Sequence, residues 1–125
     1  MRWYLLGAGV NGALGVAMGA WASHGLQGRL AAEAIDWVKT GASYQLWHAA
    51  ALLGLAAVSA RYGSRLIAVA GMCFAIGGLL FGGSLHLYAF TQQSWLAMLT
   101  PVGGTLLTFG WLAVVGSAFR GSARA

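Results

Sequence analysis

The chain has 125 residues, of which 59% are hydrophobic and 7% are charged, with seven Lys and Arg against two Asp and Glu. Average soluble proteins carry about 25% charged residues, and so few charges could not cover the surface of a small soluble domain. The composition therefore excludes an ordinary soluble protein, a disordered chain and a nucleic-acid-binding protein with a basic face. The single cysteine excludes a disulfide framework and a Cys-x-x-Cys metal or redox motif.

Four stretches without charged residues follow one another, and each has a length that suits a membrane-spanning helix. They cover residues 3–22, 44–60, 66–90 and about 99–119. The hydrocarbon layer needs roughly 20 apolar residues of helix, with a range of about 17–25, and the strands of a membrane barrel would alternate in polarity. The sequence therefore predicts an all-α membrane protein, a bundle of four transmembrane helices that forms one domain over residues 1–125.

The first stretch also has features of a cleavable signal peptide. Arg2 precedes the apolar run, and Ala20-Trp21-Ala22 has the small-x-small form of a cleavage site. The apolar run is long and is interrupted by five glycines. We therefore expect a retained first span.

The connection between the first two stretches predicts a short amphipathic helix over residues 27–40. Arg29 and Glu33 are four residues apart, and Gly41 suits a helix stop. We expect this helix to lie on the outer membrane surface with Trp37 in the headgroup region; the alternative is a solvated connector with no role of its own. Its apolar face comprises Leu26, Leu30, Ala34, Trp37 and Val38, opposite Arg29, Glu33, Asp36 and Lys39.

The positions of Lys and Arg in the short flanks predict the orientation in the membrane. The two ends and the 61–65 turn lie on one side of a four-span protein, and the 23–43 connection lies on the other. The first side carries Arg2, Arg61, Arg65, Arg120 and Arg124, and the second carries Arg29 and Lys39. This asymmetry predicts that both termini lie in the cytoplasm.

Glycine accounts for 20 of the 125 residues, about twice the usual share. In lipid, close contact between helix backbones replaces the hydrophobic drive for packing. Small residues recur on one face of the first and third spans, and Asn11 needs a hydrogen-bond partner within the membrane. A functional polar site at Asn11 is the alternative. The predicted packing positions are Gly7, Asn11, Gly15, Gly19, Gly71, Ala75, Gly78 and Gly82.

The predicted spans lack the side chains that most membrane chemistry uses. No Asp, Glu, Lys or Arg lies inside a span, which argues against carboxylate proton relays and charged ion-coupling sites. Glu33 and Asp36 lie in the connector among basic residues, which suits ion pairing. Cys73 lies in an apolar stretch that keeps a thiol inert. We therefore predict no catalytic activity, no bound metal and no cofactor.

The three histidines fall in the outer leaflet of the predicted arrangement. His24 ends the first span, His48 lies four residues into the second and His86 lies four residues before the end of the third. Tyr44, Gln45 and Ser84 lie near the same depth. Three interpretations stay open: hydrogen bonds that fix helix packing, a pocket for a polar head group or a water chain, and a site for Cu, Zn or a haem iron.

Thr100 and Pro101 predict the start of the fourth helix, with Thr100 as the N-cap and Pro101 as the first helical residue. Gly103 and Gly104 leave the first turn open, and its free N–H groups would attract an anionic group; a tight helix entry is the alternative. The predicted ligand-binding residues are His24, Tyr44, Gln45, His48, Ser84, Thr100, Gly103 and Gly104.

Four motifs along the chain resemble those of a known family. They are GAWASHGL (19–26), WVKTGASYQLWH (37–48), LFGGSL (80–85) and TPVGG (100–104), the last followed by Gly110-Trp111. Together, and in this order, they resemble domain-of-unknown-function family 423, the YgdD-like small multi-pass membrane proteins. The resemblance implies a four-span protein of the bacterial inner membrane and implies no activity. Ser43 and His86 depart from the family pattern, so a site built on His86 would be particular to this chain.

These observations predict a non-enzymatic membrane protein that acts through protein–protein or protein–lipid interaction, as a homo-oligomer or as an accessory subunit of a larger membrane complex. A protein that binds or conducts a small polar solute or a lipid head group at the outer-leaflet histidines is the alternative. A membrane subunit with a His-bound metal or haem is a third. Membrane lipid is an expected partner, and nucleic acid is not.

Overall fold

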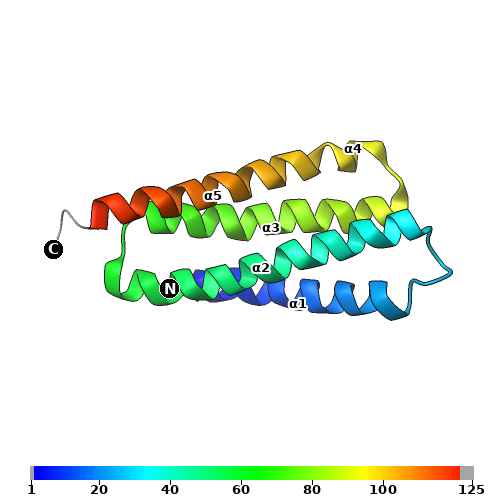
Figure 1. Ribbon diagram of the computed structural model, residues 1–125, viewed down its shortest axis with the longest axis horizontal. Helices are drawn as coiled ribbons and strands as arrows, with labels where there is room; N and C mark the ends of the chain where they lie inside the picture. The colour runs from blue at the N-terminus through cyan, green and yellow to red at the C-terminus, as the bar shows by residue number, and fades with distance from the viewer. Residues whose placement is uncertain (1, 122–125) are drawn as a thin grey trace.

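The computed structural model describes residues 2–121, which form four long helices and one short one. These are α1 (Arg2–His24), α2 (Ala32–Tyr62), α3 (Arg65–Thr91), α4 (Ser94–Ala97) and α5 (Leu99–Gly121). The long helices alternate in direction, so the two ends of the chain and the α2–α3 turn lie at one end of the bundle (Figure 1). The α1–α2 loop and α4 lie at the other end, which we call the loop end.

Three helical segments are long and apolar enough to cross a membrane, namely α1, α3 and Ser94–Arg120, which covers α4 and all but the last residue of α5. Helix α2 falls outside this group because it carries Glu33, Asp36 and Lys39 in its first turns and Gln45 and His48 further along. The four-helix arrangement agrees with the prediction. Together, the apolar helices make the chain a multi-pass membrane protein.

The separate surface helix over 27–40 is not confirmed. Helix α1 ends at His24, Gly28 adopts a positive φ of 82° in the loop, and α2 then continues without a break to Tyr62. Gly41 lies within α2 because it packs against the third helix: a Cβ on Gly41 would come within 3.1 Å of the Gly82 carbonyl oxygen. The apolar residues of this segment face the protein rather than a lipid surface, in a cluster of Ala22, Leu26, Ala34, Ile35, Val38 and Ala89.

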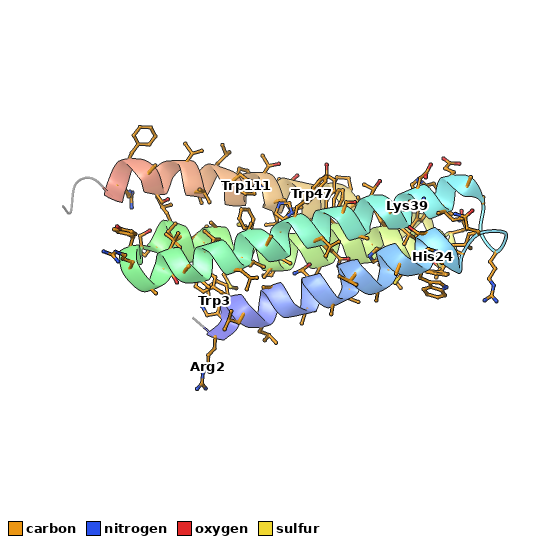
Figure 2. The ribbon with its side chains drawn as sticks, turned by 60° about the horizontal axis from the view of Figure 1, so that its bottom comes forward. Arg2, Trp3, His24, Lys39, Trp47 and Trp111 are labelled. Carbon is orange, nitrogen blue, oxygen red and sulfur yellow. The ribbon has the colours of Figure 1, made fainter. Side chains whose placement is uncertain are left out.

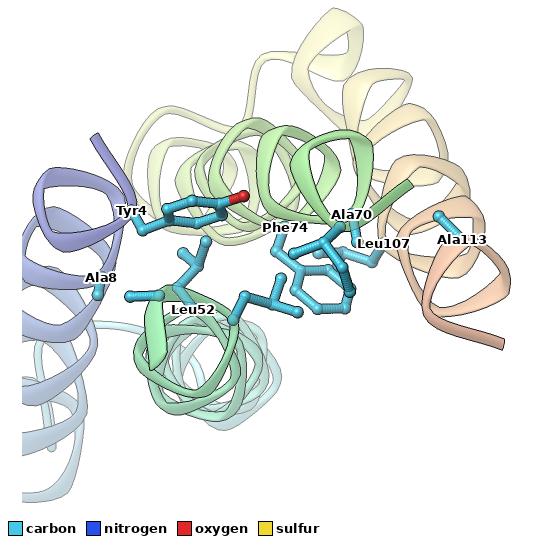
Figure 3. Packing of buried hydrophobic residues seen from close by; sticks show 10 residues of the cluster. Tyr4, Ala8, Leu52, Ala70, Phe74, Leu107 and Ala113 are labelled. Carbon is cyan, nitrogen blue, oxygen red and sulfur yellow. The ribbon is translucent and has the colours of Figure 1, made fainter. Parts of the chain in front are cut away.

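The helices pack unequally. Helices α1, α2 and α3 contact one another, whereas α5 packs mainly along α3. The hydrophobic core runs between these helices and is centred on Phe74 and Leu52, both fully buried (Figure 3). The core cluster is completed by Tyr4, Ala8, Leu55, Ala56, Ile67, Ala70, Leu107 and Ala113.

Glycines set the close spacing of the helices. A Cβ on Gly15 would lie 2.7 Å from Leu46 Cγ, and a Cβ on Gly78 would lie 2.5 Å from Asn11 Oδ1. By contrast, a Cβ on Gly9 would have nothing within 4 Å, so Gly9 faces outward. Every predicted packing position lies at a contact between helices: Gly7, Asn11, Gly15, Gly19, Gly71, Ala75, Gly78 and Gly82.

The basic residues keep their asymmetry in three dimensions. Arg2 lies at the end with the termini, and Lys39 lies near the loop end (Figure 2). Arg61 and Arg65 lie at the α2–α3 turn, and Arg120 lies near the end of α5, so they share the end of the bundle with Arg2. Arg29 belongs to the α1–α2 loop at the other end. Arg124 lies outside the described residues. Which end faces the cytoplasm stays a prediction.

Candidate functional site

His48 lies inside the bundle, where it joins α2 to α5. Its side chain is buried, and its Nδ1 lies 2.7 Å from the Tyr44 carbonyl oxygen. Because a carbonyl oxygen only accepts, Nδ1 carries the proton and Nε2 is the acceptor. The Trp111 indole N–H donates to that Nε2 at 3.0 Å. Both nitrogens of a neutral His48 are therefore satisfied by the protein, and its ring packs edge-on to Phe74.

Gln45 and His86 form a second buried pair, between α2 and α3. Gln45 Oε1 lies 2.8 Å from His86 Nε2, and the two residues are 0% and 7% exposed. The Gln45 side chain lies over Gly82, where a Cβ would come within 2.5 Å of its Cδ. Gln45 Nε2 and His86 Nδ1, both buried, have no hydrogen-bond partner among residues 2–121.

His86 is not among the residues that the sequence predicts for the site. Its spacing could have shown its role, because Gly78, Gly82 and His86 follow one another at i,i+4 on the inward face of α3. Asn11 on α1 faces this side of α3. Its Nδ2 donates to the carbonyl oxygen of Gly7 on its own helix at 3.0 Å and to that of Ala75 on α3 at 3.3 Å. Asn11 thus ties α1 to α3.

Ser84 and Thr100 join α3 to the start of α5. Ser84 Oγ donates to the Phe81 carbonyl at 3.0 Å and lies 2.6 Å from Thr100 Oγ1. Since the Ser84 proton points to Phe81, Thr100 donates to Ser84, and the lone pairs of the Thr100 oxygen remain free. Helix α5 begins at Leu99 rather than after Thr100.

The first turn of α5 is partly closed by α3. Gly103 lies against the backbone of Phe81, too close for a Cβ, and Gly104 is in ordinary contact with the Phe81 ring. The glycines thus serve a tight helix entry at this position. Tyr44 packs against the same Phe81 ring, with 4.4 Å between ring centroids.

His24 is not brought together with His48. It is exposed at the end of α1, near the α1–α2 loop (Figure 2). Gly19 packs against Ala42 in the antiparallel α1–α2 pair, so His24 is level with the region of Trp37. His48 then lies about 16 Å further along the bundle, from a rise of 1.5 Å per residue. The sequence prediction brings His24 and His48 to one depth because it begins the second span at residue 44, whereas α2 begins at Ala32.

The structure instead has an open groove between α2 and the α4–α5 segment, lined also by α3. Its volume is about 300 Å³. We call it the α2–α5 groove, and its lining residues are Trp37, Leu85, Tyr88, Ala97, Thr100 and Pro101. Of these, only Thr100 was a predicted site residue.

The groove walls are aromatic and uncharged. The rings of Trp37 and Tyr88 pack at 4.7 Å between centroids. The aromatic surface continues deeper, from the Tyr44–Phe81 contact to Trp47, whose ring lies 5.1 Å from that of Tyr44. Aromatic residues with a polar edge are typical of the membrane interface, so the groove suits an amphiphile that enters from the bilayer.

The groove and the histidines form no metal cluster. Across residues 2–121, no three side chains of His, Cys, Asp and Glu lie close enough together to hold a metal ion. His48 and His86 are instead bonded to Trp111 and Gln45.

Comparison with known proteins identifies relatives over most of the chain. A family model described as "Protein of unknown function (DUF423)" matches residues 18–104. A UPF0382 membrane protein of Haemophilus influenzae is 38% identical over 117 residues, which cover 94% of each chain. The UPF0382 inner membrane protein YgdD of Escherichia coli K12 is 35% identical, over 95% of this chain and 91% of that one.

Relatives of lower identity occur in Bacillus and Staphylococcus. The UPF0382 membrane protein YwdK of Bacillus subtilis is 31% identical, over 96% of this chain and 98% of that one. No solved structure gives a significant match. These similarities support a location in the bacterial inner membrane.

Proposed function

Because the chain belongs to the DUF423 family of proteins of unknown function, whose named relatives are membrane proteins, we propose its role from its own geometry. We propose a non-enzymatic membrane protein that binds a lipid-like amphiphile in the α2–α5 groove. The observation that carries this proposal is the open groove of about 300 Å³ at the loop end, lined by two aromatic and three apolar residues and by Thr100. Small-molecule sites are typically concave and mostly apolar, with a few polar groups that fix orientation.

The arrangement of the polar groups supports binding rather than catalysis or conduction. His48 uses both ring nitrogens in contacts within the bundle, and Gln45 pairs with His86. The interior therefore uses its imidazoles in interhelical hydrogen bonds. The groove offers aromatic surface and hydroxyl groups, which suit recognition of an amphiphile.

The test is recovery of bound amphiphile from the purified protein. Native mass spectrometry of wild-type protein released from lipid nanodiscs should detect a retained amphiphile. Ala97→Trp should abolish this retention, because Ala97 lines the cavity and an indole would fill it. Ala20→Trp is the matched control, since Ala20 is exposed on α1, away from the groove. Equal retention by both variants, or none by wild type, would contradict the proposal.

Self-association is a second candidate function, favoured by the outer surface of α1. Gly9 has open space around it, and Ala13 and Ala17 follow it at i,i+4 as exposed residues. Such small-residue faces let two helices approach closely in lipid. We propose that a homodimer would use this face. Crosslinking through Ala13→Cys in a Cys73→Ala background would detect it, with Leu112→Cys on α5 as the control.

A further inference from the structure

Three arginines lie at the end of the bundle that carries the chain termini. Arg61 lies in the last turn of α2, Arg65 begins α3, and Arg120 lies in the last turn of α5. All three side chains are exposed. We call these three residues the arginine cluster.

The members of the cluster share one level along the bundle. Arg61 and Arg65 flank the short α2–α3 turn. A Cβ on Gly116 would lie 3.2 Å from Leu66 Cδ1, so α5 passes beside the first turn of α3. Arg120 follows about one helical turn beyond Gly116, nearer the end of the bundle. Three helices therefore each contribute one guanidinium group at the same end.

No side-chain carboxylate of the chain lies near enough to neutralise the cluster. The sequence has only two, Glu33 and Asp36, and both belong to the first turns of α2. Asp36 is about 37 Å from Arg61 along that helix, at a rise of 1.5 Å per residue. The two carboxylates share the loop end with Arg29 and Lys39, so the charges balance there. At the other end, the positive charges of the cluster stay unbalanced by this chain's side chains.

The cluster lies where the apolar surface of the bundle ends. Phe119, next to Arg120, is 76% exposed, and Tyr62, next to Arg61, is 67% exposed. Arg61 Cζ lies 6.0 Å from the centroid of the Tyr62 ring. Exposed aromatic rings beside basic side chains are typical of the boundary between the hydrocarbon layer and the head groups. This pattern puts the guanidinium groups at the level of the lipid phosphates.

The type of basic residue narrows the chemistry of the ligand. Lys39 is the only lysine of the chain and lies near the loop end, so the basic residues at the end with the termini are all arginines. A guanidinium donates two parallel N–H bonds to a phosphate, whereas an ammonium acts as a point charge. An acidic protein would also be negative, but the exposed rings beside the arginines favour a ligand that has acyl chains.

We infer that the arginine cluster binds the phosphate of an anionic phospholipid in the membrane leaflet at that end of the bundle. Three unbalanced positive charges attract a head group with a net negative charge and repel the ammonium of a zwitterionic one. The cluster is separate from the α2–α5 groove, which opens at the loop end. Its ligand is therefore an addition to the amphiphile of the proposed function.

The experiment compares two lipids on the purified full chain by native mass spectrometry. Phosphatidylglycerol and phosphatidylcholine with the same acyl chains are added to the detergent solution in equal amounts. The wild-type protein should retain phosphatidylglycerol in preference to phosphatidylcholine. The preference should fall as the salt concentration rises, because salt screens exposed charges.

Matched variants remove two positive charges from one end of the bundle or from the other. Arg61→Gln combined with Arg65→Gln should lower the apparent affinity for phosphatidylglycerol about thirtyfold. Arg29→Gln combined with Lys39→Gln is the control and should leave that affinity unchanged. If the first double variant folds poorly, Arg120→Gln alone should lower the affinity about fivefold.

Three results would overturn the phospholipid site. The first is equal retention of the two lipids by the wild type, and the second is an equal loss of affinity in the two double variants. The third is displacement of the lipid by inorganic phosphate or by polyglutamate, which would assign the cluster to a free anion or to an acidic protein.

One further variant separates this site from the groove. Ala97→Trp fills the α2–α5 groove at the loop end and should leave the preference for phosphatidylglycerol unchanged. If Ala97→Trp abolishes that preference and the arginine variants do not, the lipid occupies the groove. The proposed function then stands, and the phospholipid site at the arginine cluster is wrong.

Discussion

The indole N–H of Trp111 on α5 donates to Nε2 of His48 on α2 at 3.0 Å. Helix α5 packs mainly along α3, so this bond is a polar tie between α5 and the α1–α2 pair. It needs a neutral His48 with the proton on Nδ1, which the Tyr44 carbonyl selects. His48 therefore acts as a fixed acceptor.

Removing the donor of this bond should destabilise the protein. Trp111→Phe keeps an aromatic ring against Phe74 but leaves Nε2 of the buried His48 without a partner. We expect a loss of about 1 kcal/mol in the free energy of unfolding, measured by denaturation in mixed detergent. Trp47→Phe is the control, since Trp47 is 61% exposed. Equal stability of the two variants would mean that the bond contributes nothing.

Overpacking the glycine contacts should be costly at inward positions. Gly15→Leu and Gly78→Leu each place a side chain where a Cβ already comes within 2.7 Å of another helix. We expect each to cost well over 1 kcal/mol, the scale of overpacking in a filled core. Gly9→Leu should be milder because a Cβ there would have nothing within 4 Å. Similar melting temperatures for all three variants would show that these helix faces are wrongly assigned.

Much of this packing could be predicted from the sequence. The i,i+4 spacing of small residues identifies the contact faces of α1 and α3, and Asn11 is the one strongly polar residue of the first span. Local spacing suffices here because small residues at i,i+4 share one helix face. Helix bounds at charged residues, such as Arg65 at the start of α3, follow from the same local pattern.

The polar interior could be predicted only in part. Gly41 looks like a helix stop in the sequence, yet it packs against Gly82 within the bundle. Its role depends on the neighbouring helix, which local sequence does not specify. The prediction also puts His24 and His48 at one depth, although they lie about 16 Å apart along the bundle at a rise of 1.5 Å per residue. The α2–α5 groove depends on where α4 places Ala97, and no spacing rule gives that position.

The basic residues predict how the bundle is oriented in the membrane. In a Cys73→Ala background, Gln27→Cys should react with a membrane-impermeant thiol reagent in intact cells, whereas Tyr62→Cys should not. Both positions are exposed at opposite ends of the bundle. Tyr62 is preferable to Gly63, where a Cβ would lie 2.9 Å from the Ser59 carbonyl oxygen. The reverse labelling pattern would place the termini outside the cytoplasm.

The most direct test of amphiphile binding in the α2–α5 groove is a map of photolabelling. A tailed amphiphile with a diazirine next to its polar end is activated in nanodiscs, and the labelled peptides are sequenced by mass spectrometry. Binding in the groove predicts that labels concentrate on residues 85–88 and 97–101, compete with the unlabelled amphiphile, and disappear in Ala97→Trp. Labels spread evenly over the exposed faces of α1 and α5, and unchanged by Ala97→Trp, would contradict it.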